Sequence, residues 1–173
     1  WLREAHTVIW VANSKQALAA FAISDVIKPT SKEAIHNLQQ KGISVYMLTG
    51  DNEATAKSVA EKLGIQHYKA EVLPEQKAAF VKELQLIGKK VAMVGDGIND
   101  STALAQADVS IAMGKGNDIA MDVAKMTIIS SDLNKISTAI QLSKSTVATI
   151  KQNLFWAFIY NLIGIGLAMA GLM

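Results

Sequence analysis

The sequence of 173 residues contains no cysteine, so disulfides, thiolate metal sites and a cysteine nucleophile are excluded. A charge excess is also lacking, because 17 basic and 15 acidic residues leave a net charge of only +2 at pH 7. Such a small net positive charge predicts no nucleic-acid partner. Half of the residues are hydrophobic, which is enough for a sizeable core. The chain starts at Trp1 and ends in an apolar run, so we expect it to be part of a longer protein.

The first thirty residues have the pattern of two paired strands followed by a connector. Apolar runs at residues 7–12 and 17–23 flank a short polar turn, and this spacing predicts a β-hairpin. Residues 24–30 (SDVIKPT) are charged and contain a proline. They are therefore a candidate hinge.

Between residues 31 and 129, short apolar runs alternate with segments of helical period. Thr30 and Glu33 have the spacing of a capping box at the start of the first helix, which ends at Gly42. The later strands are apolar throughout, as strands covered on both faces require. This alternation predicts an α/β fold, a Rossmann-type parallel sheet with helices on both faces. The expected strands are residues 43–48, 65–68, 91–94, 109–112 and 126–129, and the expected helices are residues 31–41, 53–63, 74–87, 101–105 and 118–124.

A long helix is predicted after these strands, with Asp132 as its N-cap. Its first part, residues 133–152, is amphipathic, whereas residues 153–173 carry no charge. At about 1.5 Å per residue the uncharged part spans roughly 30 Å, the thickness of a bilayer core. Lys144 and Lys151 suit the cytoplasmic side. These features predict a transmembrane helix in a lipid bilayer, with a buried helix of a large soluble protein as the alternative.

The strand expected at residues 91–94 stops at a loop of glycines and acids, GDGIND. In open parallel sheets, ligands bind at the carboxyl ends of the strands. Gly95 and Gly97 allow the backbone to turn sharply and to approach a ligand closely. Asp96 and Asp100 flank this turn and are candidate ligands of one hard cation, for which Mg²⁺ is the best match.

A second strand end, in MLTGDN, has a related composition. The Thr49 hydroxyl and the loop amides beside it are candidates for binding phosphate oxygens. Lys77, at the start of the next helix but one, is a candidate for neutralising the same phosphate. Taken alone, GDG is also a common turn, and Asp100 fits a simple cap of the helix at 101–105. The ordered combination of TGD, P-x-x-K and GDGxxD favours a phosphoryl site.

With these motifs in this order, the sequence resembles the phosphorylation domain of P-type ATPases, which belongs to the haloacid dehalogenase superfamily. The resemblance covers nearly the whole chain, and it implies four parts. These are the end of a nucleotide-binding domain with the hinge (1–24), the phosphorylation domain (25–131), an amphipathic linker helix (132–152) and a transmembrane helix (153–173). The segments that carry the resemblance are MLTGDN, AEVLPEQKAAFVKELQ, VAMVGDGIND and ALAQADVSIAMGKGND.

The resemblance also implies a reaction, in which the γ-phosphate of ATP passes to an aspartate and the aspartyl phosphate is then hydrolysed. Thr49 would hydrogen-bond the phosphoryl group and Lys77 would neutralise it. Asp96 would hold Mg²⁺, with Asp100 close by and Asn99 supporting the site. Asp51 would lie at the nucleotide side of the cleft. The cofactor-binding positions implied in this way are Gly50, Asp51, Gly95 and Gly97.

The nucleophile of this family lies in a DKTGT motif, and that string does not occur in this sequence. We expect it upstream of Trp1, on a strand at the centre of the sheet. We therefore expect this chain to hold only part of the phosphorylation site and to have no ATPase activity alone.

The segment KQNLFWAFIYNLIGIG resembles the membrane helix that follows the phosphorylation domain in copper-transporting P-type ATPases. There a Tyr-Asn pair, here Tyr160 and Asn161, contributes to the Cu⁺ pathway, whereas zinc and cadmium transporters would have a lysine in this helix. The resemblance implies a Cu⁺ pump whose catalytic part is cytoplasmic. The alternatives are a pump for another cation, a soluble phosphatase of the haloacid dehalogenase type, and a non-catalytic regulatory membrane protein.

Overall fold

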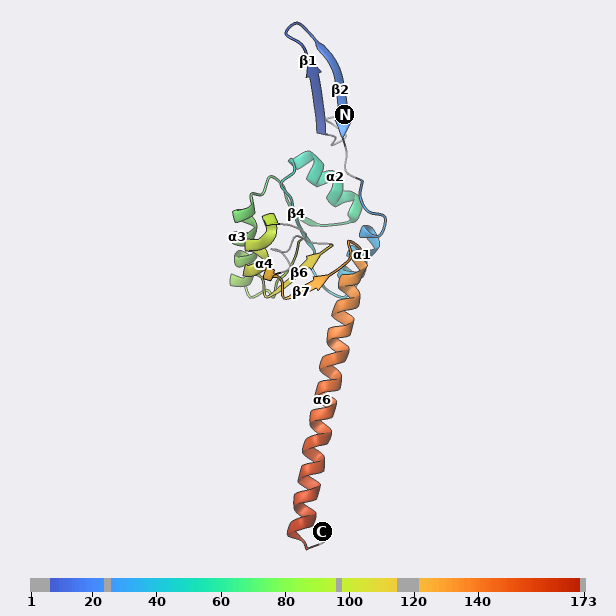
Figure 1. The fold of residues 1–173 in the computed structure, drawn as a ribbon, viewed down its shortest axis with the longest axis vertical. Helices are drawn as coiled ribbons and strands as arrows, with labels where there is room; N and C mark the ends of the chain where they lie inside the picture. Colours follow the sequence, from blue (N-terminus) through green and yellow to red (C-terminus); the bar gives the residue numbers. More distant parts are fainter. Residues whose placement is uncertain (1–6, 24–25, 96–97, 115–121, 172–173) are drawn as a thin grey trace. The chain divides into compact units, whose positions relative to one another are not determined.

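A computed structural model describes residues 7–23, 26–95, 98–114 and 122–171 (Figure 1). The chain divides into two compact units, Trp1–Lys135 and Ile136–Met173. The strands that the structure describes all lie in the first unit, and the second contains most of one long helix.

The first two strands form the predicted hairpin. Strands β1 (Thr7–Ala12) and β2 (Ala17–Ile23) pair antiparallel, with a shift of register at the end of β1. The Asn13 side chain closes the turn, because its Oδ1 accepts hydrogen bonds from the backbone N–H groups of Lys15 and Gln16 at 2.9 and 2.8 Å. The predicted strand bounds are confirmed.

The rest of the first unit is an α/β domain, which confirms the predicted fold class. Its strands are all parallel but form two separate pieces, with orders β3-β4 and β5-β6-β7. The order along the chain is α1 (Ser31–Gln40), β3 (Tyr46–Leu48), α2 (Glu53–Leu63), β4 (His67–Lys69), α3 (Pro74–Leu86), β5 (Ala92–Gly95), the 3-10 helix η2 (Ile98–Asp100), α4 (Ser101–Gln106), β6 (Val109–Met113) and β7 (Met126–Ile128).

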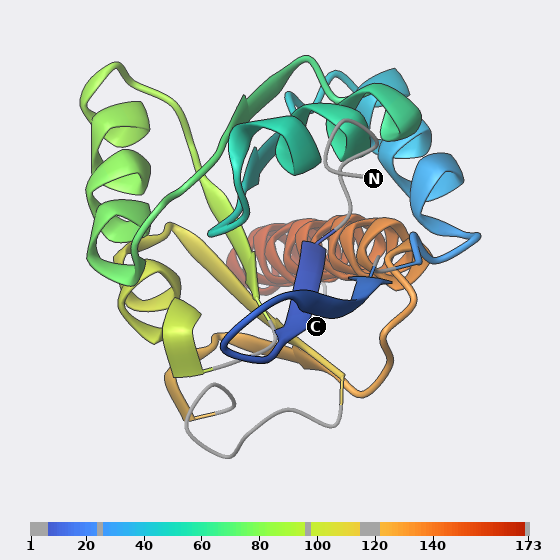
Figure 2. The same ribbon diagram turned by 90° about the horizontal axis from the view of Figure 1, so that it is seen from above.

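The helices form two pairs that cover the strands, α1 beside α2 and α3 beside α4 (Figure 2). Leu104 of α4 is fully buried against Ala112 of β6, and Met93 of β5 packs on both. Ile35 of α1 and Ala60 of α2 form a second buried group with Ile65. The predicted apolar strand at 109–112 is confirmed as a core strand, because β6 is buried from its second residue onward.

Two predicted strands begin later than expected, because the helix before each one uses the first residues of the apolar run. The N–H of Ile43 donates to Leu38 O of α1, and the N–H of Ile65 donates to Ala60 O of α2. Each apolar residue thus closes a helix end rather than pairing in the sheet. The predicted helix at 118–124 falls mostly outside the described residues.

The predicted capping box at Thr30 is wrong. Thr30 stands at the N-cap of α1, but its side chain makes no capping hydrogen bond, since its backbone is helical (φ −80°, ψ −10°) rather than extended. The chain enters α1 through a turn instead, in which the N–H of Ser31 donates to Lys28 O at 3.0 Å across Pro29.

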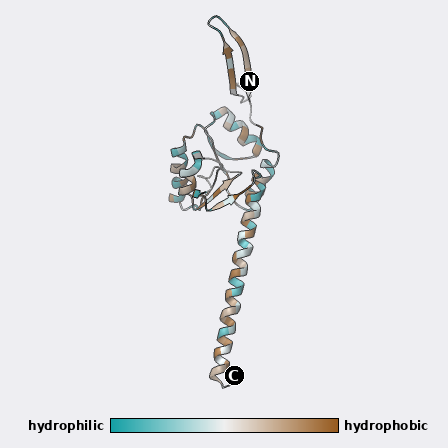
Figure 3. Ribbon diagram, in the orientation of Figure 1, coloured by the Kyte–Doolittle hydropathy of each residue, from teal (hydrophilic) through white to brown (hydrophobic). Residues whose placement is uncertain are grey.

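The long helix α6 (Asn134–Met169) has 36 residues, and all but its first two belong to the second unit. Asp132 precedes it as predicted, and its Oδ1 accepts a hydrogen bond from the Asn134 N–H at 3.1 Å. Among the described residues α6 is the one helix that is long and apolar enough to cross a membrane. Its last turns are mainly white and brown in the hydropathy colouring of Figure 3.

An acidic side chain fixes the end of β5 that lies far from the GDG loop. The Asp108 carboxylate accepts hydrogen bonds from the Val91 N–H, from Gln85 Nε2 and from Lys90 Nζ, at 3.0, 3.1 and 3.0 Å. The Val91 backbone donor, then Gln85 and Lys90, hold the pKa of Asp108 well below its ordinary value of 3.8. Because the folded-state pKa is lowered, this carboxylate stabilises the fold above about pH 4, and the contribution is lost as the pH falls below that value.

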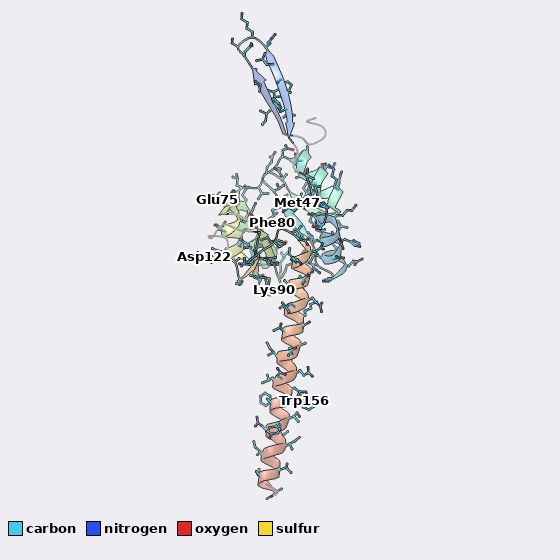
Figure 4. The ribbon with its side chains drawn as sticks, turned by 45° about the vertical axis from the view of Figure 1, so that its right-hand side comes forward. Met47, Glu75, Phe80, Lys90, Asp122 and Trp156 are labelled. Atoms are coloured by element: carbon cyan, nitrogen blue, oxygen red, sulfur yellow. The ribbon has the colours of Figure 1, made fainter. Side chains whose placement is uncertain are left out.

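We therefore expect Asp108→Asn to lower the urea midpoint of unfolding at about pH 7 and to have a smaller effect at about pH 3. The matched control is Asp122→Asn, an exposed acid that Figure 4 labels together with Lys90. An equal loss of stability at both pH values would contradict the proposed contribution of the carboxylate charge.

Candidate functional site

A largely buried ion pair joins α3 to the end of the GDGIND loop. Lys77 Nζ lies 2.7 Å from Asp100 Oδ1, and the two side chains are only 15% and 14% exposed. Lys77 is in the first turn of α3, which Pro74 opens, and Asp100 is the last residue of η2. Asp100 makes no side-chain capping bond to α4, so the alternative that it serves only as a helix cap is wrong.

Gly95, at the end of β5, lies directly against this ion pair. A Cβ atom at Gly95 would stand 2.8 Å from both Cβ and Oδ2 of Asp100. Only glycine therefore fits at this position with Asp100 in its observed place. One strand end, one acid and one lysine are thus in direct contact.

The TGD loop after β3 forms a compact turn of its own. The Thr49 hydroxyl donates to Asp51 Oδ2 at 2.7 Å, and the Asp51 N–H donates to Thr49 Oγ1 at 3.1 Å. Asp51 is exposed and Thr49 is half-buried. Asn52, the next residue, caps α2 by accepting a hydrogen bond from the Thr55 N–H at 2.9 Å. The loop therefore holds its polar side chains at the carboxyl end of β3, as a ligand site requires.

Backbone hydrogen bonds join the TGD loop to the segment that leads into α3. Thr49 donates its N–H to Lys69 O at 3.1 Å and accepts from the Val72 N–H at 2.9 Å. The Glu71 N–H donates to Asp51 O at 2.8 Å. The segment 69–72, which accepts one of these bonds and donates the other two, continues directly into Pro74 and Lys77. The TGD loop and the Lys77 helix are therefore fixed to one another through their backbones.

The other predicted site residues are exposed or lie outside the described residues. Asp96 and Gly97 lie outside the described residues. Asn99 is exposed on η2. Tyr160 and Asn161 are exposed on α6. No group of three or more His, Cys, Asp or Glu side chains suited to a metal occurs in the described parts of the chain.

Sequence reasoning missed two residues that shape the site. Gln76 Oε1 accepts a hydrogen bond from the Leu73 N–H at 2.9 Å and so fixes the first turn of α3. The available signal was the glutamine three positions after Leu73, because Leu73 precedes Pro74 and so stands at the predicted helix start. Glu71 has a positive φ of 53°, for which a glutamate in the sequence gives no signal.

The chain is similar in sequence to a known family and to known proteins. A family model described as haloacid dehalogenase-like hydrolase matches residues 1–108. The probable copper-importing P-type ATPase A of Enterococcus hirae is 55% identical over 167 residues, which is 95% of this chain and 23% of that protein. The copper-exporting P-type ATPase of Bacillus subtilis is 50% identical over 168 residues, or 97% of this chain and 21% of that protein.

The structure also resembles a solved P-type ATPase. A crystal structure of a zinc-transporting PIB-type ATPase in the E2.Pi state superposes with a TM-score of 0.85 and 33% identity, over 99% of this chain and 28% of that one. The chain spans about a quarter of the length of the curated relatives it matches. Since the family model matches more than half of the residues, the chain belongs to the haloacid dehalogenase-like hydrolases.

Proposed function

We propose that this chain is part of an ATP-driven metal pump of the P-type, in which it supplies most of the phosphorylation site and the membrane helix that follows. The observation that carries the proposal is the ion pair of Lys77 and Asp100 against Gly95, tied by backbone bonds to the TGD loop. The relatives' names support the same function.

In the proposed reaction the γ-phosphoryl group of ATP is transferred to an aspartate carboxylate and ADP leaves. Water then attacks the aspartyl phosphate, which releases inorganic phosphate and restores the carboxylate. Lys77 brings a positive charge to the phosphoryl oxygens, and the Thr49 hydroxyl donates a hydrogen bond to one of them. Positioning and charge neutralisation supply most of the catalysis in such transfers.

The residues present suit a magnesium ion. Lys77 binds Oδ1 of Asp100, and Oδ2 faces the end of β5, from which Asp96 follows at once. Carboxylate oxygens are the protein ligands that Mg²⁺ prefers. Asp96 and Asp100 would hold the ion, which supplies further positive charge to the phosphoryl group. Gly50, Asp51 and Gly97 would line the nucleotide side of the site.

The nucleophilic aspartate would come from a strand between the two pieces of the sheet. Within the described residues β3 pairs only with β4, and β5 pairs only with β6, so each has one edge left for a partner. The loops TGD and GDG follow these two strands. A parallel strand paired with both would deliver its last residues between the two loops. This arrangement would complete the site with a residue that this sequence lacks.

We propose Cu⁺ as the transported ion and a membrane-spanning position for α6, with the catalytic part on the cytoplasmic side. Two relatives are named for copper transport, and the uncharged segment 153–173 contains no lysine. Tyr160 and Asn161 lie within that segment, where polar side chains are costly and so tend to be functional. Lys144 and Lys151 precede the segment and would face the cytoplasm.

The function is tested with the full-length protein that contains this chain, purified from membranes and given radiolabelled ATP, Mg²⁺ and Cu⁺. We expect a phosphoprotein that is stable in acid and cleaved by hydroxylamine, as an acyl phosphate is, and that is lost when Mg²⁺ or Cu⁺ is chelated. Recovery in the soluble fraction with phosphatase activity toward small phosphate esters would favour the alternative of a soluble phosphatase instead.

A separate prediction concerns the ion route. Asn161→Leu in the full-length pump is expected to abolish most Cu⁺-stimulated phosphorylation, because it removes an amide from the membrane-spanning part of α6. The matched control is Asn153→Leu, the same change at the start of the uncharged segment, where water is within reach. Unchanged copper stimulation and copper tolerance in the Asn161 variant would exclude this side chain from the route.

A further inference from the structure

We propose that Glu71 is a positioning residue for phosphoryl transfer and that it acts through its backbone conformation rather than through its carboxylate. The inference rests on the proposed function, since it assigns a role within the same site. It concerns the segment between β4 and α3, which none of the roles above includes.

Glu71 is the one non-glycine residue with a positive φ, 53°, in the described parts of the chain. Left-handed backbone is disfavoured for residues with a Cβ atom, and it persists where the surrounding structure holds it. The side chain is exposed, and within the described residues its carboxylate has no hydrogen-bonding or ionic partner. The conformation is therefore held by the backbone and not by the side chain.

The backbone bonds at this point all lead to the TGD loop. The Glu71 N–H donates to Asp51 O at 2.8 Å, and the next N–H, that of Val72, donates to Thr49 O at 2.9 Å. Two successive N–H groups reach two carbonyls of one loop because the chain turns sharply at Glu71. The Val72 carbonyl lies 3.9 Å from the Cβ position of Gly50, an ordinary van der Waals distance, so the segment also lies beside the middle of the loop.

The other end of this segment sets the position of Lys77. Val72 is buried, and Leu73 is extended (φ −71°, ψ 156°) and leads into Pro74 at the first position of α3. Lys77 follows in the first turn and meets Asp100. The left-handed turn at Glu71 thus fixes the distance between the loop that carries Thr49 and the helix that carries Lys77. Both side chains must reach one phosphoryl group in the proposed reaction.

The test separates backbone from charge with three substitutions in the full-length pump. Glu71→Gly and Glu71→Asn remove the carboxylate but tolerate a positive φ, whereas Glu71→Val removes the carboxylate and disfavours that conformation. The matched control is Glu75→Val, the same change in the first turn of α3, where Figure 4 labels Glu75 and where the backbone is helical.

We expect Glu71→Val to lower the maximal rate of phosphoenzyme formation by roughly 100-fold with little change in the KM for ATP, as a small misplacement of catalytic groups does. The glycine and asparagine variants should stay within about threefold of the unsubstituted pump, because they keep the turn. Hydrogen exchange of the peptide spanning 69–73 should accelerate only in the valine variant. Equal losses in all three Glu71 variants would assign the role to the carboxylate and overturn the inference.

The exchange measurement keeps this inference separate from the proposed function. If the unsubstituted pump forms no phosphoenzyme, the proposed function fails. If the pump is active and Glu71→Val keeps both its rate and its exchange protection, the positioning role alone is wrong.

Discussion

Replacing Lys77 with methionine is expected to lower phosphoenzyme formation by the full-length pump at least about 100-fold, the usual loss when one electrostatic stabiliser of a transition state is removed. The amine is the cationic side chain that the structure holds beside Asp100 and the end of β5, at 2.7 Å from the carboxylate and 15% exposed. Methionine keeps the volume of the side chain, so the loss reports on charge rather than on packing.

The same substitution should also destabilise the domain, because it leaves the 14%-exposed carboxylate of Asp100 without its partner. Breaking a buried ion pair on one side costs about 3 kcal/mol. The double variant Lys77→Met with Asp100→Asn removes both charges and should recover much of the stability while staying inactive. Because Asp100 is itself a proposed ligand of Mg²⁺, the double variant tests stability alone, and its recovery would assign the loss in Lys77→Met to the unpaired carboxylate.

The control for both measurements is Lys82→Met. Lys82 is an exposed lysine on the same helix, so the change in net charge and in helix composition is the same. We expect activity and stability close to those of the unsubstituted pump. If Lys77→Met retained activity similar to that of Lys82→Met, the phosphoryl-neutralising role of Lys77 would be excluded, and the ion pair with Asp100 would be structural.

Local chemistry explains why the sequence predicted some features of this site and missed others. Alternating composition predicted the hairpin bounds and the parallel direction of the later strands. Turn residues predicted where helices end, as Gly64 does for the helix Glu53–Leu63, with a φ of 73°. The late starts of β3 and β4 depend on hydrogen bonds to carbonyls five residues back, which compete with the sheet for the same apolar run. Periodicity alone does not distinguish these two uses.

Contacts between distant segments were harder to predict. The motifs predicted that Lys77 and Asp100 belong to one site, but not that they pair directly across 23 residues of sequence. They predicted that a ligand approaches the backbone closely at Gly95, whereas in the structure the Asp100 side chain lies there. The left-handed turn at Glu71 has no sequence signal, since it depends on backbone partners at residues 49 and 51.

Gly95→Ala is expected to have the second large effect, although it adds a single methyl group. The new Cβ would lie 2.8 Å from Cβ and Oδ2 of Asp100 and 3.1 Å from its Cγ. The near atoms include Cβ, which is fixed close to the backbone of η2, so rotation of the side chain does not relieve the contact. Either η2 or the end of β5 has to move. Overpacking of this kind costs about 1–3 kcal/mol.

The activity should fall more steeply than the stability, because the displaced group is the partner of Lys77. A shift of Asp100 by a few tenths of an ångström lengthens the 2.7 Å contact and moves the lysine charge away from its site. We expect a loss of about 100-fold in phosphoenzyme formation. Gly50→Ala is the control for stability only, since Gly50 belongs to the proposed nucleotide side. Its added Cβ would have its nearest contact at 3.9 Å, from Val72 O, an ordinary van der Waals distance. If Gly95→Ala matched Gly50→Ala in unfolding midpoint and kept the activity of the unsubstituted pump, the close packing of Gly95 on Asp100 would have no part in holding the lysine.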